Sequence, residues 1–173
     1  MKKYLSLIAV SVLALGVNNA NAITGTGNAS ATILQDTGIT ESQAMDFGYL
    51  LKGTSDHVVV LDTNNQRSGT NAYLVGGTAA KSGLFAITGA AGQDVKITVP
   101  TSFTLTNGTS TLNVSNVRVK IGSTGSEQAA GTNLAGAIDS QGGLELAVGG
   151  SLTVSSTATY GVYEGTYEVI VNY

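Results

Sequence analysis

The stretch GTYEVIVNY, Gly165–Tyr173, carries the clearest β-strand pattern in this chain of 173 residues. From Tyr167 onward every second residue is aromatic or Val, and most residues between them are polar. Side chains of a strand alternate between its two faces, so this period of two predicts a strand with one apolar and one polar face. The ending therefore indicates a sheet that covers a hydrophobic core.

Similar short patterns recur upstream, separated by turns rich in Gly, Asn and Asp. The dipeptide Asn107–Gly108 is a typical hairpin turn. The best helical pattern, Ser126–Ile138, is interrupted by Gly131 and Gly136, so no helix of useful length is expected. The other predicted strands are Ala44–Leu51, His57–Asp62, Ala72–Gly76, Gly83–Gly89, Asp94–Pro100, Ser102–Thr106, Ser110–Gly122, Gly143–Gly150 and Ser151–Ser156.

About ten short strands without helices predict an all-β fold, an antiparallel two-sheet β-sandwich of Ig-like or pilin-like type. We expect a leader at residues 1–22 and a single domain at residues 23–173. The glycine pairs Gly142–Gly143 and Gly149–Gly150 are expected to mark bulges or tight turns. The expected core residues are Ile33, Phe47, Val59, Leu61, Leu74, Phe85, Ile87, Val95, Ile97, Val99, Leu105, Leu146, Leu152, Val154, Tyr167, Val169 and Val171.

The leader has the three parts of a secretory signal peptide. Lys2 and Lys3 form its basic start, Leu5–Val17 is its apolar run, and ANA at Ala20–Ala22 is its cleavage signal. An apolar run of about a dozen residues is shorter than the roughly 20 that a membrane-spanning helix needs. We therefore expect export through the Sec pathway to the periplasm, the cell surface or the medium, with no integral membrane segment in the mature chain.

The chain is acidic and sparsely charged. Charged residues make up 11% of it, and removal of Lys2 and Lys3 with the leader shifts the net charge from −3 to −5. Nucleic acid is not an expected partner, because binding to phosphates needs Lys and Arg. The sequence has no Cys, so no disulfide stabilises the exported domain. So low a charge suggests that part of the surface faces a partner, as in a filament or coat.

The sequence contains no catalytic constellation. His57 is the single His, and no GxSxG motif accompanies it, so an enzyme is not expected. The acidic pairs Glu41/Asp46 and Glu164/Glu168 are expected on solvated strand edges instead of in a cleft suited to glycoside hydrolysis. No catalytic residue, metal ligand or cofactor is predicted.

The segment DTNNQ, Asp62–Gln66, places oxygen-bearing side chains at alternate positions, as calcium-binding loops do. It lacks the Glu that closes such loops. Clusters of Asp, Asn and Gly usually form turns through bonds from their side chains to the backbone, so a turn is predicted here.

The first stretch after the leader, ITGTGNASATI at Ile23–Ile33, alternates apolar or small residues with polar ones. A strand of this length spans about 36 Å, roughly the height of a sandwich. It is either the first edge strand of its own domain or a donor strand that completes the sheet of the next subunit. Gly25 and Gly27 count against the donor role, since they offer no side chain for insertion. The donor-strand candidates are Ile23, Ala29, Ala31 and Ile33.

Several segments recur in the same order in one bacterial family. They are MDFGYL at Met45–Leu50, VVVLDTNNQRS at Val58–Ser68, FAITGAAGQDVKITVP at Phe85–Pro100, LAVGGSLTV at Leu146–Val154 and the closing GTYEVIVNY. Through them the chain resembles the exported bacterial family called domain of unknown function 4402, over about residues 29–173. The family's name implies no activity, and its similarity to pilin-like and spore-coat-like β-sandwiches is an analogy of fold.

Three functions remain open on the sequence. The first is an exported structural or adhesive surface protein, a fimbria-like subunit assembling by strand addition through Ile23–Ile33, with itself or a pilus-assembly chaperone as partner. The second is a stand-alone secreted β-sandwich that binds a ligand. The third is an eight-stranded outer-membrane barrel, which the final Tyr173 favours but the lack of Trp and the short strands oppose. Whether residues 23–34 pair within the chain or remain available to a neighbour distinguishes the first two.

Overall fold

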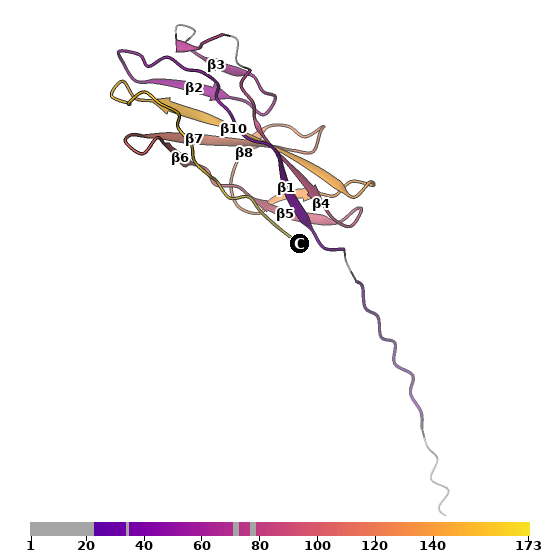
Figure 1. Ribbon diagram of the computed structural model, residues 1–173. Coiled ribbons are helices and arrows are strands. Elements are labelled where there is room, and N and C mark those ends of the chain that lie inside the picture. Colours follow the sequence, from indigo (N-terminus) through magenta and orange to yellow (C-terminus); the bar gives the residue numbers. More distant parts are fainter. Residues whose placement is uncertain (1–22, 34, 71–72, 77–78) are drawn as a thin grey trace, which may run out of the picture. The chain divides into compact units, whose positions relative to one another are not determined.

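The chain divides into two compact units, Met1–Ile33 and Leu34–Tyr173. All eleven strands found in the described part of the chain belong to the second unit (Figure 1). The predicted signal peptide lies outside the described residues, and no helix among these residues has the length and apolar character needed to cross a bilayer. The computed structural model describes residues 23–33, 35–70, 73–76 and 79–173.

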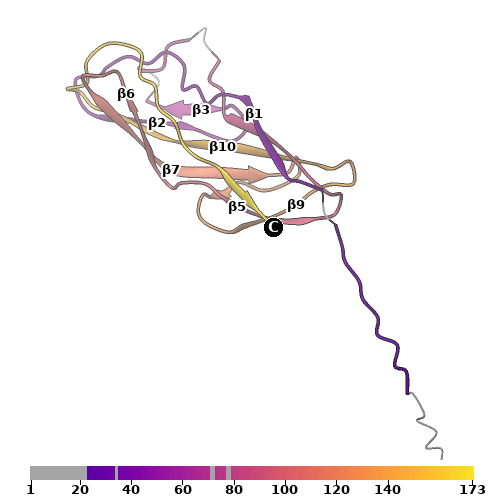
Figure 2. The same ribbon diagram turned by 60° about the horizontal axis from the view of Figure 1, so that its bottom comes forward.

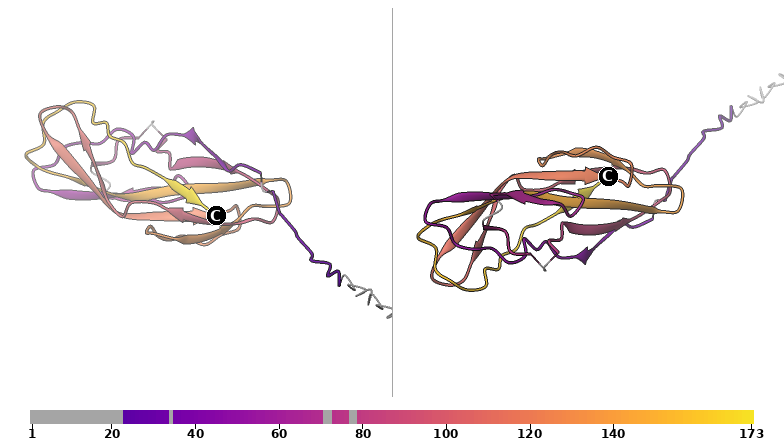
Figure 3. Two further views of the ribbon diagram at one scale, coloured as in Figure 1. Left: turned by 90° about the horizontal axis from the view of Figure 1, so that it is seen from below. Right: turned by 90° about the horizontal axis from the view of Figure 1, so that it is seen from above.

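The larger sheet is organised around its longest strand, β10 (Gly143–Val154). One edge of β10 pairs with β7 (Thr111–Ile121). The other edge pairs first with β4 (Gly83–Thr88) and then with β2 (His57–Leu61). All these pairs are antiparallel, and Figure 3 shows β10 running through the middle of the strands of the second unit.

Four shorter strands extend this sheet. They are β1 (Gly38–Gln43), which pairs with β4, β3 (Arg67–Gly69), which pairs with β2, and β6 (Phe103–Thr106) and β8 (Gln128–Ala129), which both pair with β7. In the strand order β1-β4-β10-β2-β3, β1 is therefore an outermost strand.

The smaller sheet has the strand order β11-β5-β9. Its central strand β5 (Asp94–Thr98) pairs with β11 (Ile170–Asn172) and with β9 (Leu134–Ala137), both antiparallel. Two antiparallel sheets without a helix among the described residues confirm the predicted all-β fold, and the arrangement is consistent with a β-sandwich.

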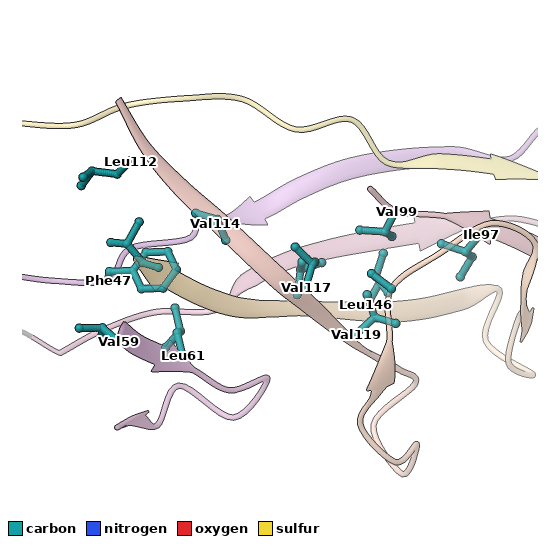
Figure 4. Close-up of a cluster of buried hydrophobic side chains, with 14 of the residues drawn as sticks. Phe47, Val59, Leu61, Ile97, Val99, Leu112, Val114, Val117, Val119 and Leu146 are labelled. Carbon is teal, nitrogen blue, oxygen red and sulfur yellow. The ribbon is translucent and has the colours of Figure 1, made fainter. Parts of the chain in front are cut away.

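The hydrophobic core consists mainly of inward-facing residues of these strands, and segments between strands add others, such as Phe47 and Val99 (Figure 4). Ten of the expected core residues are buried: Phe47, Val59, Leu61, Ile87, Val95, Ile97, Val99, Leu146, Leu152 and Val154. Six more are partly buried against them: Leu74, Phe85, Leu105, Tyr167, Val169 and Val171. The prediction for Ile33 is wrong, because this side chain is 95% exposed and belongs to the first unit.

A bulge lets both halves of β7 face the core. Three steps along β7, from Ser115 to Arg118, lie opposite two steps along β10, from Gly149 to Ser151. Asn116 takes up the extra residue with a φ of 47°. The buried positions consequently change from even to odd numbers along the strand. The buried residues of β7 are not among the core residues expected from the sequence; they are Leu112, Val114, Val117 and Val119.

The glycines opposite this bulge allow a close approach of β2. A β-carbon on Gly149 would overlap the carbonyl oxygen of Leu61, so a side chain has no room there. The expectation of a bulge at Gly149–Gly150 is confirmed, but β10 continues through it as one strand instead of the two that were predicted.

Two predicted strands are shorter in the structure. Ala44–Leu51 contains only isolated bridges, at Asp46 and Leu50, and Gly165–Tyr173 contains a bridge-free stretch followed by β11. The predicted strand Ala72–Gly76 begins at a residue outside the described part, and only Leu74 in it forms a bridge. Strands β1, β3, β8 and β9 were not predicted, because their exposed, mostly polar or small residues show no apolar alternation.

Candidate functional site

The predicted donor strand, Ile23–Ile33, is exposed along its whole length. The structure assigns no strand to these residues, and the first strand of the second unit is β1. The edge strand of the domain is thus β1, and Ile23–Ile33 does not take that place. The candidates Ile23, Ala29, Ala31 and Ile33 are all exposed, and their role as donor residues stays a prediction.

His57 is a packing residue at the start of β2. Its ring is buried and stacks on the ring of Tyr73, with 4.1 Å between the ring centroids. Neither ring nitrogen has a hydrogen-bond partner in the structure. Within the described stretches, no group of three or more His, Cys, Asp or Glu residues could hold a metal ion.

The segment Asp62–Gln66 forms a turn, as predicted. Oδ1 of Asp62 accepts hydrogen bonds from two backbone N–H groups of the turn, at 2.8 and 2.7 Å. Asn65 has a φ of 65°, and its Oδ1 accepts a bond of 2.7 Å from the backbone N–H of Ser82. The side-chain oxygens are therefore used to fix the turn and to attach it to the segment before β4.

The acidic residues Glu41, Asp46, Glu164 and Glu168 are all exposed to solvent, as expected. Oδ1 of Asp46 accepts a hydrogen bond of 2.7 Å from the backbone N–H of Gly48. Three of the four, Glu41, Asp46 and Glu164, lie around one groove.

This groove has a volume of about 870 Å³ and opens between two segments that are far apart in the sequence. One wall consists of residues 44–50, which follow β1, and the other of residues 159–165, which precede β11. Both walls can be followed in Figure 2, the first in purple after β1 and the second in yellow leading to the C-terminus. We call this hollow the edge groove.

The first wall is held by Lys81 and Arg67, neither of which lines the groove. Asp46 exchanges two backbone hydrogen bonds with Lys81, of 2.7 and 2.8 Å. The guanidinium group of Arg67 donates to the carbonyl oxygens of Phe47 at 2.7 Å and Val75 at 2.8 Å. Because the guanidinium is planar and presents its donors in a fixed fork, it locks the wall onto the neighbouring segment.

The second wall is held in the same way by β6. Glu164 exchanges backbone hydrogen bonds with Thr106, of 2.8 and 3.0 Å. The hydroxyl of Tyr163 donates to the carbonyl oxygen of Thr159 at 2.8 Å and so braces the turn that leads into the wall. Backbone pairing with Lys81 and with Thr106, neither of which lines the groove, therefore fixes both walls.

The floor of the edge groove is the hydrophobic core itself. Leu112, Leu152 and Val154 line the groove and are 7%, 3% and 7% exposed. Phe103 and Leu105 of β6, both partly buried, complete the lining on the side of the second wall. A chain that lies in this groove would cover core residues, and burial of apolar surface is the main driving force for association.

Tyr167 connects the second wall to the larger sheet. Its ring stacks on Phe103, with 4.7 Å between centroids, and meets Phe85 edge-on at 5.9 Å. Its hydroxyl is buried without a hydrogen-bond partner and lies against Gly83. Burial, with a smaller contribution from the charge of Glu41, raises the pKa of Tyr167 above its usual range. The side chain therefore stays uncharged at neutral pH.

The rim of the edge groove carries exposed apolar side chains. Tyr49, Tyr160 and Val162 line it and are 68%, 85% and 77% exposed. Nζ of Lys52 lies 4.9 Å from the centroid of the Tyr160 ring, which shows that the two walls come together at this end. A cluster of exposed large apolar residues is typical of an interaction site.

The edge groove is not predicted by the sequence. Its walls are adjacent only because the strand pairing brings them together, and no local pattern encodes that adjacency. The strand pattern of Ala44–Leu51 marks the first wall in the sequence, but no predicted strand covers residues 159–164 of the second wall.

The match to known proteins covers the second unit. The model of the family described as "Domain of unknown function (DUF4402)" matches residues 37–173, a range that includes both walls of the edge groove. Ile23–Ile33 lies ahead of this range. No curated protein and no solved structure matches the chain.

Proposed function

The chain belongs to the family of the domain of unknown function DUF4402, and on this premise we propose that it is an exported structural or adhesive subunit of the bacterial surface. Copies of the chain assemble into a fimbria-like fibre by β-strand addition. In this assembly Ile23–Ile33 of one copy is the donor strand.

The observation that carries this proposal is the state of Ile23–Ile33. The segment has the alternation of a strand and no charged residue, yet it is exposed and forms no strand in the single chain. It also precedes the range that the family model matches, so the domain has its own core without it. An extended, uncharged segment ahead of a β-domain is suited to adding a strand to an open sheet edge.

The small side chains of the segment define what kind of pocket would receive it. A β-carbon on Gly25 or Gly27 would have no atom within 4 Å, so these glycines are not required by a contact in the single chain. Between the large residues Ile23 and Ile33, the apolar face offers only Gly and Ala. A matching site therefore needs a close backbone approach along most of its length and larger pockets at its ends.

Export is part of the proposal and is supported by the leader pattern ahead of residue 23. In the periplasm a subunit with an open sheet edge is at risk of unspecific pairing. A pilus-assembly chaperone that covers the edge until assembly is therefore a second proposed partner. Transport to the cell surface or the medium would follow.

A stand-alone binding module is the second candidate function. The observation that favours it is the group of tyrosines along the edge groove, Tyr49, Tyr160, Tyr163 and Tyr167. Tyrosines combine apolar area with a hydroxyl and are common in binding surfaces. Such a module would remain monomeric while it binds its ligand.

The oligomeric state of the mature chain separates the two functions. The chain from Ile23 onward and a variant without residues 23–33 would be purified and compared by light scattering and negative-stain microscopy. We expect oligomers or fibres from the first and monomers from the second. Microscopy of cells with and without the protein would then show whether surface fibres depend on it.

A monomeric mature chain is the result that would contradict the proposed assembly. A mature chain that remains a protease-resistant monomer at high concentration, with residues 23–28 dispensable, contradicts assembly and leaves the binding module. A folded, monomeric deletion variant is the control, because the second unit forms its own core.

A further inference from the structure

We infer that the edge groove is the acceptor site for Ile23–Ile33 of a second copy of this chain. The inference rests on the proposed function and adds to it the place where the donor strand binds. Four features of the groove lead to this assignment: its strand edges, its floor, its length and its charge.

Each wall continues the outermost strand of a sheet. β1 ends the order β1-β4-β10-β2-β3, and β11 ends the order β11-β5-β9. The backbone bonds of Asp46 and Glu164 go to Lys81 and Thr106, neither of which lines the groove. The strands that the walls continue, β1 and β11, each pair with one neighbour in their sheets, β4 and β5, so each keeps one open edge among the described residues. One inserted strand could pair with both edges at once.

The floor explains why the occupant should be a strand with one apolar face. Core residues Leu112, Leu152 and Val154 form the bottom of the groove, and apolar residues stand at its rim. The walls offer backbone groups and the floor offers apolar contacts. A strand presents both at once, because its backbone groups lie in the plane of the sheet and alternate side chains point to one face.

The donor is long enough to cover the groove. The first wall has seven residues, 44–50, and can span at most about 25 Å, whereas Ile23–Ile33 spans about 36 Å as a strand at about 3.3 Å per residue. The hydroxyl of Tyr173 donates to the carbonyl oxygen of Gln35 at 2.8 Å. This bond joins the chain before β1 to the chain after β11.

The charge of the groove also agrees with this occupant. Glu41, Asp46 and Glu164 line it together with a single base, Lys52. A donor with acidic residues would be repelled, whereas Ile23–Ile33 has no charged residue. Because these residues form no strand in the single chain, they are available to pair with another copy.

Engineered disulfides test the site directly, because the natural chain has no Cys. Two separate populations of the mature chain would carry Ala31→Cys in the donor and Ala44→Cys in the groove, with different tags. A third population carries Ala91→Cys, an exposed alanine between β4 and β5, as the matched control. Disulfides form only where the two Cα atoms approach within about 7 Å. The experiment is repeated with Ala29→Cys in place of Ala31→Cys, which covers a donor shifted by two residues along the groove.

We expect mild oxidation of the mixed Ala31→Cys and Ala44→Cys populations to give a covalent heterodimer at least tenfold more abundant than with Ala91→Cys. If fibres form but the heterodimer is no more abundant with Ala44→Cys than with Ala91→Cys, the groove assignment is overturned and the proposed function stands. Absence of both fibres and the cross-link would overturn both. A chain carrying both Ala31→Cys and Ala44→Cys that closes on itself as a monomer would show that the donor fills its own groove, which also overturns the inference.

A second variant keeps the test independent of disulfide geometry. Ala44→Arg places a long, charged side chain at the exposed lining of the groove, and Ala91→Arg places the same side chain in the control turn. We expect Ala44→Arg to abolish assembly and Ala91→Arg to leave it intact, with the same melting temperature for both. Normal fibres from Ala44→Arg would contradict the assignment.

Discussion

The hydroxyl of Tyr167 lies directly against the backbone of Gly83, in the space that a β-carbon of residue 83 would need. The contact joins the chain before β11 to β4, so it links the second wall of the edge groove to the larger sheet. It also gives the protein a pair of residues whose effects on stability should depend on each other.

Gly83→Ala should destabilise the domain by about 1–3 kcal/mol, because the added methyl group overlaps the Tyr167 hydroxyl. Tyr167→Phe removes this hydroxyl, and the next ring atom lies 3.5 Å from the new β-carbon, which is an ordinary contact. The double variant should therefore recover most of the loss. Urea unfolding of the four proteins measures this coupling, and an equal cost of Gly83→Ala in both backgrounds would disprove it.

Tyr167→Phe alone should be neutral or should stabilise the domain by about 1 kcal/mol. The buried hydroxyl loses its hydrogen bonds to water on folding and gains none within the protein, so its removal eliminates this desolvation cost. The same change should alter the response to alkali. The folded-state pKa of Tyr167 is raised above its ordinary value of about 10. Its contribution is therefore complete below about pH 10 and is lost as the pH rises further, since the unfolded state then releases the proton more readily.

The corresponding measurement is the melting temperature at pH 8 and pH 11. The natural protein should lose more of its melting temperature over this interval than Tyr167→Phe does. Parallel losses in the two proteins would show that the phenol does not ionise differently on unfolding.

Ala31→Asp should block assembly, because a charge on the apolar face of the donor would have to be buried in the acceptor. Ser30→Asp places the same charge on the polar face and should permit assembly. Both residues are exposed in the single chain, so neither change should alter the melting temperature of the monomer. Sedimentation of fibres from the two variants provides the comparison, and equal sedimentation would refute the orientation of the donor.

Asn65 holds the β2–β3 turn through its Oδ1, which accepts a bond from the N–H of the fully buried Ser82. Asn65→Gly should cost about 1–3 kcal/mol, because this donor is left without its partner. Asn65→Ala should cost about 1 kcal/mol more, because the φ of 65° disfavours a side chain without local bonds. Asn65→Asp keeps the acceptor and serves as the control. The free energies of unfolding are measured with denaturant. Equal values for Asn65→Ala and Asn65→Gly would exclude a contribution from the backbone conformation at residue 65.

Much of the fold follows from local patterns. β2, β4 and β5 have turn residues at both ends and lie where the sequence predicts them. Each places large apolar residues at alternate positions that face the core: Val59 and Leu61, Phe85 and Ile87, and Val95 and Ile97. The turn at Asn107–Gly108 between β6 and β7 is also confirmed, with Gly108 at a φ of 84°. In these strands the residues that favour strand conformation are also those that face the core. Their alternation in the sequence is therefore sufficient to predict the strand.

Features that depend on neighbouring strands are not visible in this way. β1 reads GITESQ and is exposed along nearly its whole length, so it shows no apolar alternation although it pairs with β4. The bulge at Asn116 reverses the inward face of β7 and hides its second half from a simple periodic search. Ile33 has the character of a core residue, but its segment lies outside the domain.

The edge groove shows the same limit for function. Ile23–Ile33 can be singled out as a candidate because its alternation is contiguous in the sequence. The proposed acceptor combines residues 44–50 with residues 159–165, and only the three-dimensional structure shows that these two segments line one groove next to the outermost strands β1 and β11.

The bond between Tyr173 and Gln35 has a practical consequence. Since the side chain of Tyr173 reaches the start of the domain, a short loop after residue 173 could turn the chain back along the second wall. A copy of ITGTGNASATI appended there and removed from the front would make a self-sufficient, soluble monomer, a form of the subunit that is convenient for crystallisation or display.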